Sequence, residues 1–151
     1  MVLDVNGKKH SVAADPKTPL LYILRNELQL NGPHYGCGMQ QCGACMILLN
    51  GKAQPSCMLP LASAADQKIV TIEGLSNGEK LHPVQQAFVD EQAAQCGYCL
   101  NGMVISAVSL LHENPSPDDG YIREAMQRSL CRCGTYARAI RAVKKAAANI
   151  K

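Results

Sequence analysis

The sequence has very little aromatic bulk, with no tryptophan and one phenylalanine among its 151 residues. A chain of this length is enough for one domain or two small ones, but it offers few large rings with which to fill a core. In small domains a bound metal can supply part of the folding free energy. The shortage of aromatic side chains is therefore compatible with a fold that a cofactor helps to stabilise.

A strong net charge and long hydrophobic runs are also missing. The net charge is +3 and no basic stripe alternates with aromatic residues, so a nucleic acid is not expected as a partner. No apolar run approaches the ~20 residues needed to cross a bilayer, which argues against direct membrane insertion. Residues 1–7 lack the charged and apolar regions of a signal peptide. We therefore expect a cytoplasmic protein, and a periplasmic one only after leader removal or export together with a partner.

The common signatures of catalysis are absent as well. The chain has no P-loop, no G-x-G-x-x-G and no Ser–His–Asp pattern. Asp90-Glu91 and Asp118-Asp119 are paired acids that suit helix faces and helix starts better than acid–base chemistry. The histidines are expected to be surface or capping residues; they are His10, His34, His82 and His112. We therefore expect no catalytic residue in this chain.

What the sequence does contain is eight cysteines, which form two sets of four. The first set has the spacing C-x4-C-x2-C-x11-C, which is the plant-type spacing for four thiolates around a [2Fe–2S] cluster. Its members are Cys37, Cys42, Cys45 and Cys57. Glycines at positions 36, 38 and 43 would let backbone N–H groups approach the cluster sulfurs closely. This loop therefore predicts an iron–sulfur site.

The second set combines a C-x2-C pair with a C-x-C pair, each lying between two predicted helices. Its members are Cys96, Cys99, Cys131 and Cys133. Sites in helical bundles are commonly built where facing helices converge. If the two turns meet at one end of a bundle, they gather four thiolates. We therefore predict a second [2Fe–2S] cluster.

Zinc and disulfides are the alternatives for these cysteines. Disulfides are typical of oxidising compartments, and the Cys42–Cys45 and Cys131–Cys133 pairs are too close in sequence for comfortable bridges. Zinc ribbons use two C-x2-C pairs in one site, whereas each half of this chain has one such pair. Iron–sulfur clusters are favoured over both alternatives.

The N-terminal half shows two hairpin patterns. Residues 2–5 and 8–12 flank Asn6-Gly7, and residues 46–49 and 52–56 flank Asn50-Gly51; Asn-Gly pairs suit tight hairpin turns. The second hairpin would return Cys57 to the loop. Between the hairpins, Thr18-Pro19 predicts the start of a helix that Asn31-Gly32 ends, with apolar positions at Leu20, Leu21, Leu24 and Leu28.

From about residue 76 the pattern is helical. After a last strand at residues 69–72, helices are predicted from Pro83 to near Gly97, over residues 100–112, over residues 119–130, and onward from Thr135 as N-cap. The sequence therefore predicts an α+β protein. Residues 1–75 would form a β-grasp ferredoxin-like domain and residues 76–151 a four-helix bundle that binds the second cluster.

At this point the motifs resemble a known family, the small iron–sulfur subunits of the xanthine oxidase family of molybdenum hydroxylases. The resemblance rests on the first cysteine set, on Gln-Cys-Gly-Tyr-Cys at 95–99 and on Leu-Cys-Arg-Cys-Gly-Thr-Tyr at 130–136. It covers nearly the whole chain and implies the β-grasp and four-helix fold. It also implies a large partner subunit with a molybdenum–pyranopterin cofactor and, in some members, an FAD subunit.

Three details are similar to one branch of that family. Gly134-Thr135-Tyr136 replaces the common Thr-Gly-Tyr, residues 100–103 replace the common Thr-Pro-Gly-Met, and Gln40-Gln41 precedes Cys42. The branch contains isoquinoline 1-oxidoreductase, nicotinate dehydrogenase and related aldehyde dehydrogenases. It implies an N-heterocyclic or aldehyde substrate, and electrons that often leave to haem cytochromes or other carriers rather than through FAD.

The resemblance also implies roles for residues. The first cysteine set would hold the outer cluster and the second set the inner cluster, nearest molybdenum. Gln95 and Cys133 would contact the pterin bound by the partner. Electrons would pass from substrate to molybdenum, pterin, inner cluster, outer cluster and acceptor. Apart from the resemblance, the position of Arg132 between two cysteines suits charge tuning, a salt bridge or a partner contact.

Two other functions stay open. One is a free-standing two-cluster ferredoxin-like carrier, which would have an acidic surface and no need of the helical half; the net charge and the second cysteine set argue against it. The other is a zinc-stabilised interaction module, which would be colourless and redox-silent.

Overall fold

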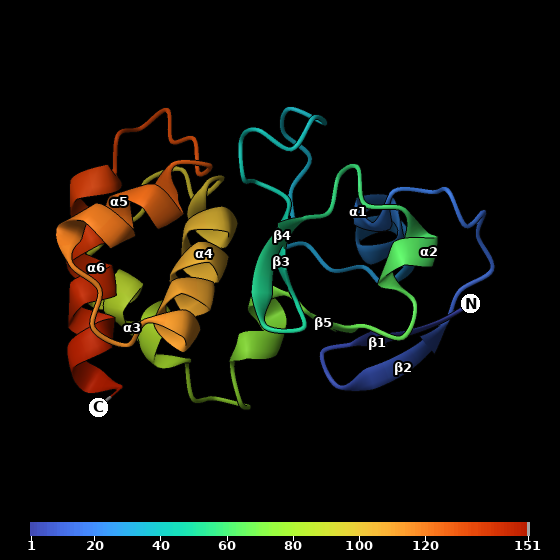
Figure 1. Ribbon diagram of the computed structural model, residues 1–151, viewed down its shortest axis with the longest axis horizontal. Coiled ribbons are helices and arrows are strands. Elements are labelled where there is room, and N and C mark those ends of the chain that lie inside the picture. The colour runs from blue at the N-terminus through green and yellow to red at the C-terminus, as the bar shows by residue number, and fades with distance from the viewer. Residues whose placement is uncertain (151) are drawn as a thin grey trace.

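The computed structural model describes residues 1–150 and shows a small sheet beside a group of helices (Figure 1). The N-terminal elements are β1 (Val2–Val5), β2 (Lys8–Ser11), α1 (Leu20–Tyr22) with a π-helical turn (Ile23–Glu27), β3 (Met46–Leu49), β4 (Lys52–Pro55), α2 (Leu61–Ala64), β5 (Lys68–Val70) and a 3₁₀ turn (Ile72–Leu75). The C-terminal helices are α3 (Pro83–Asp90), α4 (Leu100–Glu113), α5 (Asp119–Met126) and α6 (Tyr136–Asn149). This arrangement confirms the predicted α+β class, with a β-grasp ferredoxin-like domain followed by a four-helix bundle.

The sheet has five strands in the order β2-β1-β5-β3-β4. Strands β1 and β5 are parallel, and the other neighbours are antiparallel. Both predicted hairpins are present, and their Asn-Gly turns have positive φ at both positions: 53° and 75° at Asn6-Gly7, and 50° and 84° at Asn50-Gly51. Two consecutive positive φ angles are what a tight type I′ hairpin needs, which is why these two pairs located the turns correctly.

The first helix is shorter than predicted at both ends. It begins at Leu20 with Pro19 as its N-cap residue, and the Thr18 side chain does not cap it. The Thr18 carbonyl accepts a hydrogen bond from the N–H of Leu61 at 2.8 Å. It stops at Glu27 rather than at Asn31-Gly32, because Gln29 adopts the left-handed conformation with φ of 57°. Long-range and turn geometry here override the local helical pattern.

The last strand also ends earlier than predicted, at Val70 instead of Ile72. The N–H of Thr71 donates to the side-chain oxygen of Asn6 at 2.9 Å, so a side chain replaces the next strand partner. A 3₁₀ turn then follows directly.

Two of the C-terminal helices end before the predicted residues. Helix α3 stops at Asp90 instead of near Gly97. Just after this end, Gln92 adopts the left-handed conformation with a φ of 50°. Helix α5 stops at Met126 instead of Leu130. The N–H groups of Gln127 and Ser129 donate three residues back, at 3.1 and 2.9 Å, and the N–H of Leu130 then donates to the carbonyl of Cys42 at 3.0 Å. A contact distant in sequence therefore holds the chain just after α5.

The remaining helix predictions agree better with the structure. Helix α4 extends one residue past the predicted end, and α6 follows Thr135 as predicted. The Thr135 hydroxyl does not cap that helix and lies instead 3.3 Å from the sulfur of Cys131. His82 is a capping histidine, since its Nδ1 accepts from the N–H of Val84 at 3.2 Å. No helix among residues 1–150 has the length and apolar character needed to span a bilayer.

Strand β3 lies at the centre of the fold, between α4 on one side and α1 on the other (Figure 1). Its side chains alternate between two hydrophobic cores, as successive residues of a strand point to opposite faces. Ile47 packs with Leu3 and Leu20, whereas Met46 and Leu48 pack with the helices. Both faces of the strand are therefore buried. The division of the chain at residues 75 and 76 stays a prediction.

The loop before β3 approaches α4 so closely that only glycine fits. A Cβ atom added to Gly102 would lie 2.3 Å from the Gly43 carbonyl oxygen, and one added to Gly43 would lie 2.3 Å from the Arg128 carbonyl oxygen. Beside them, the side-chain amide of Asn101 donates to the carbonyls of Ala44 and Met46, both at 2.9 Å. The loop, the start of α4 and the segment after α5 therefore form one backbone junction.

This junction predicts that Gly102→Ala destabilises the protein, although alanine favours a helix more than glycine does. The helix gains about 1 kcal/mol from the substitution, but overpacking against fixed backbone costs about 1–3 kcal/mol, so we expect a lower midpoint of thermal unfolding. Gly120→Ala is the matched control, because its nearest atom is the end of the Asp118 side chain, at 3.1 Å. A Gly102→Ala midpoint at or above the wild-type value would contradict the close approach.

Candidate metal centres

The first cysteine loop is folded around the sulfur of Cys37. The N–H groups of Met39, Gln41 and Cys42 donate to this sulfur at 3.4, 3.2 and 3.4 Å. In return, the N–H of Cys37 donates to the sulfur of Cys42 at 3.3 Å. Positive φ angles at Gly38 and Gln40 curl the loop so that these donors converge. Cys37 and Cys42 therefore form one close pair in a setting that stabilises anionic sulfur.

Cys45 and Cys57 form a second close pair. Both are buried and pack against Leu21. The β3–β4 hairpin brings them together, because its register pairs Met46 with Pro55 and so directs the chain back to the loop. Ser56, which precedes Cys57, donates its hydroxyl to the Cys45 carbonyl at 2.7 Å. The hairpin thus returns the fourth cysteine as predicted.

The two pairs differ in acidity. At Cys37 desolvation raises the pKa, but the backbone N–H donors outweigh it and lower the pKa to about 7. Burial raises the pKa of Cys45 to about 11. Hydrogen bonds to the charged form and desolvation thus act in opposite directions. The loop therefore favours a thiolate at Cys37 and a protonated thiol at Cys45 when nothing is bound.

In the second set, Cys99 and Cys131 are neighbours. Cys99 directly precedes α4. The sulfur of Cys131 accepts a hydrogen bond from the N–H of Thr135 at 3.5 Å, and the Thr135 hydroxyl also lies beside it. At Cys131 desolvation raises the pKa, but these Thr135 contacts help to lower it to about 7. Burial, and then the adjacent Cys131, raises the pKa of Cys99 to about 12. This pair thus has the same contrast as Cys37 and Cys45.

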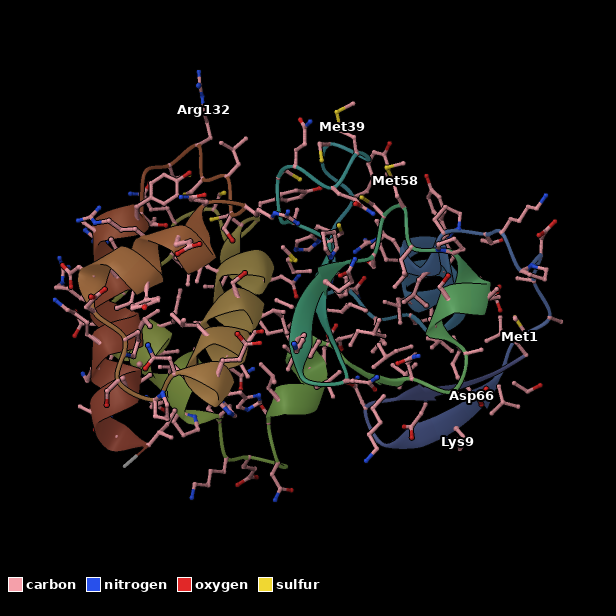
Figure 2. All side chains as sticks on the ribbon, in the orientation of Figure 1. Met1, Lys9, Met39, Met58, Asp66 and Arg132 are labelled. Atoms are coloured by element: carbon pink, nitrogen blue, oxygen red, sulfur yellow. The ribbon has the colours of Figure 1, made fainter. Side chains whose placement is uncertain are left out.

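The other members of the second set lie nearer the surface. Cys96 is exposed and Cys133 is half-buried against the helical core. A recess of about 310 Å³ is lined by Cys96, Tyr98, Cys99, Leu130, Cys131 and Arg132. Gln95 is exposed next to Cys96, and Figure 2 shows Arg132 pointing away from the molecule. Three cysteines therefore share one opening, with Gln95 beside it.

Both cysteine sets lie on the same side of the molecule. Figure 2 shows Met39 and Met58, beside the first set, along the upper edge that also carries Arg132. The sequence reasoning missed the direct link between the sets, which is the hydrogen bond from the N–H of Leu130 to the Cys42 carbonyl. No sequence pattern could have indicated this contact, because Leu130 makes it with its backbone N–H and any residue other than proline could do the same. Tyr98 also links the two sets, through its hydroxyl and the carbonyl of Tyr35, and its position between two cysteines was a sequence signal that could have indicated such a role.

All eight cysteines are free thiols, so the disulfide alternative is not what the structure shows. Within residues 1–150, no group of three or more His, Cys, Asp or Glu side chains is arranged to hold a metal ion. The cysteines are instead grouped as close pairs, with Cys96 and Cys133 farther out.

Two family models match consecutive parts of the chain. The one described as a 2Fe-2S iron-sulfur cluster binding domain matches residues 3–72, and the one described as a [2Fe-2S] binding domain matches residues 71–144. Together they cover both cysteine sets.

Characterised relatives are similar over almost the whole chain. One subunit of nicotinate dehydrogenase from Pseudomonas putida is 56% identical over 96% of this chain and 92% of its own length. The alpha subunit of isoquinoline 1-oxidoreductase from Brevundimonas diminuta is 45% identical over 95% of this chain and 94% of its own length. The solved aldehyde oxidoreductase from Desulfovibrio desulfuricans superimposes with a TM-score of 0.93 at 37% identity, covering 99% of this chain and 17% of that longer chain.

These similarities confirm the predicted family, its branch, its electron-transfer role and its [2Fe–2S] cofactors. They also confirm that the chain works within a multi-subunit oxidoreductase, beside a large subunit that carries the molybdenum cofactor. The chain belongs to the small iron–sulfur subunits of the xanthine oxidase family of molybdenum hydroxylases.

Proposed function

We propose that each cysteine set holds one [2Fe–2S] cluster and that the chain passes electrons from the partner's molybdenum–pterin site to an external acceptor. The observation that carries this proposal is the pairing of thiols. A [2Fe–2S] cluster has two irons and four cysteine ligands, so two cysteines per iron are expected. The pairs Cys37 with Cys42, Cys45 with Cys57, and Cys99 with Cys131 suit that pattern. A single tetrahedral zinc would instead need four sulfurs around one point.

The outer cluster would be held by the first set and the inner cluster by the second. The proposed ligands are Cys37, Cys42, Cys45 and Cys57 for the outer cluster and Cys96, Cys99, Cys131 and Cys133 for the inner one. Each cluster takes up one electron at a time. The N–H donors around Cys37 and Cys131 would stabilise the sulfur charge that iron binding requires. Hydrogen bonds of this kind are among the factors that set the reduction potential of a cluster.

The backbone supports transfer between the two sets. Leu130 is bonded covalently to Cys131, and its N–H donates to the carbonyl of Cys42. One hydrogen bond therefore joins a proposed inner ligand to a proposed outer ligand through otherwise covalent bonds. The glycine junction at Gly43 and Gly102 would hold this connection at constant length.

The inner set would face the molybdenum subunit. Cys96 and Gln95 are exposed, and the recess beside them opens at the surface, so these groups are available to a partner. We propose that Gln95 and Cys133 contact the pterin that the partner binds. Arg132 is exposed at the same opening and is available to the same partner.

The outer set would face the acceptor. Met39 and Met58 flank its cysteines and are 56% and 55% exposed. A partner with an apolar face could therefore approach the outer cluster closely. For the branch to which the chain belongs, we propose a haem cytochrome or another carrier as this acceptor; the second candidate is a partner that binds FAD.

The substrate is selected in the partner subunit. Nicotinate and isoquinoline stand in the names of the two relatives above, and both are N-heterocycles. We propose an N-heterocyclic substrate for the complex, with an aldehyde as the second candidate because an aldehyde oxidoreductase shares the fold. We also propose a cytoplasmic location, since eight free thiols suit a reducing compartment.

Electron paramagnetic resonance (EPR) of the chain purified with its partner tests the number and type of clusters. We expect two distinct [2Fe–2S] signals after reduction and four irons per chain by metal analysis, in line with about two irons per set of four thiolates. One signal would contradict the two-cluster proposal. Zinc in place of iron would support the redox-silent interaction module.

Alkylation of the cluster-free folded chain tests the acidity of the outer ligands. Iodoacetamide reacts with thiolates, and at pH 7 the thiolate fractions of Cys37 and Cys45 differ by about 5000-fold. Because the more acidic thiolate is the weaker nucleophile, we expect Cys37 to be modified on the order of 100-fold faster than Cys45. Cys37 is also more accessible to the reagent than the buried Cys45. The dependence of each rate on pH separates the effect of thiol pKa from the effect of access. The Cys37 rate should level off above pH 8, since its pKa is about 7, whereas the Cys45 rate should keep rising towards pH 11.

The denatured chain is the control for this experiment, because both thiols should then react alike. Parallel pH profiles for Cys37 and Cys45 in the folded chain would show that the N–H donors do not stabilise the Cys37 thiolate.

A further inference from the structure

Tyr98 lies between two proposed inner ligands, yet its side chain contacts the outer loop. Its ring stacks on the imidazole of His34, with the ring centroids 4.6 Å apart and the planes 16° from parallel. Its hydroxyl donates to the carbonyl of Tyr35, two residues before Cys37. The side chain is 51% exposed, so it contributes little to either core. Both of its functional groups are thus used to join the two cysteine loops.

His34 is itself held firmly by the outer loop. Its N–H donates to the carbonyl of Ala44 at 2.9 Å, and Ala44 lies between Cys42 and Cys45. Arg25 donates to the Pro33 carbonyl at 2.7 Å and lies 3.4 Å from His34 Nδ1. Burial, and then the charge of Arg25, lowers the pKa of His34 and so favours the neutral imidazole. The surface on which Tyr98 stacks is therefore part of the outer loop's framework.

The inner and outer sets are also joined by Asn101, two residues after Cys99, whose amide donates to the Ala44 carbonyl, and by the hydrogen bond from Leu130 to Cys42. That bond is next to Cys131, whereas Tyr98 is next to Cys99 and two residues from Cys96. Among the residues between Cys96 and Cys99, Tyr98 is the one that hydrogen-bonds the outer loop. Attachments on different inner segments restrict rotation as well as separation.

The ordinary interpretation of Tyr98 is a surface aromatic pair that adds about 0.5–1.5 kcal/mol of stability. That interpretation does not explain why the ring and the hydroxyl both reach residues beside the outer ligands. A group that must keep two sites at a set distance needs this kind of contact, because small displacements change transfer rates strongly.

We propose that Tyr98 is a positioning residue that sets the geometry of the inner cysteine loop against the outer loop, and with it the rate of electron transfer between the clusters. The inference rests on the two-cluster function proposed above. In the step concerned, one electron would pass from the reduced inner cluster to the oxidised outer cluster. The inner cluster would become oxidised and the outer cluster reduced, with no proton moved and no covalent bond changed.

The test uses the complete enzyme complex with Tyr98→Ala and His34→Ala. Two readouts are measured: the spin–spin splitting in the EPR spectrum when both clusters are reduced, and the rate at which the outer cluster is reduced after rapid mixing with whichever N-heterocycle or aldehyde reduces the wild-type complex. We expect Tyr98→Ala to alter the splitting and to slow this rate on the order of tenfold. His34→Ala should act in the same direction, and the double variant should be no slower than Tyr98→Ala, because both changes remove one shared contact.

Tyr121→Ala is the matched control, since Tyr121 is similarly exposed but lies on α5 and contacts neither loop through a stacked ring. It should leave both readouts unchanged. Wild-type splitting and rate in Tyr98→Ala would overturn the inference while leaving two [2Fe–2S] signals, and so the proposed function, intact. If Tyr98→Ala loses a cluster, His34→Ala decides, because it leaves the inner loop unaltered; wild-type behaviour there would also overturn the inference. Fewer than two [2Fe–2S] signals in the wild-type complex would overturn the proposed function instead.

Discussion

Gly43 and Gly102 bring the backbone of the outer cysteine loop into contact with the backbone of α4, and most of the molecule's organisation depends on that contact. A side chain at either position would overlap a carbonyl group at 2.3 Å. The approach lets Asn101 donate to two carbonyls of the loop and lets the segment after α5 reach Cys42. Since both cysteine sets lie at this junction, its geometry determines how far apart the two centres stand.

Strand β3 joins the two hydrophobic cores behind this junction. Its run of apolar residues is buried on both faces, with Ile47 in the N-terminal core and Met46 and Leu48 in the helical core. A strand that only one layer covered would leave the helical half free to move relative to the loop. Because β3 begins directly after Cys45, the packing of the two cores is transmitted to the cysteines without an intervening flexible segment.

The pKa values of the cysteine thiols also follow from the way the loops fold. In each set, one cysteine receives backbone or hydroxyl donors and has a lowered pKa, while a second has a raised pKa because desolvation outweighs its hydrogen bonds. The donors are products of the loop conformation, since the positive φ angles at Gly38 and Gln40 turn the N–H groups towards Cys37. Iron binding would remove the remaining protons, so the fold prepares one thiolate in each set and the metal completes the others.

The sequence by itself determined the cysteine spacing, the two Asn-Gly hairpins and the helical second half, because each depends on neighbours within a few residues. Those features were enough to predict the fold class, the cluster type and the family. Only the tertiary structure decided where α3 and α5 end, that the Thr135 hydroxyl lies against Cys131 instead of capping α6, and that Tyr98 stacks on His34. For Tyr98, and for Leu130 after α5, the physical reason is range, because their partners His34 and Cys42 are distant in sequence and no local pattern records such a contact. For Thr135 the reason is competition between two nearby groups, the Cys131 sulfur and the start of α6, which residue spacing alone does not decide.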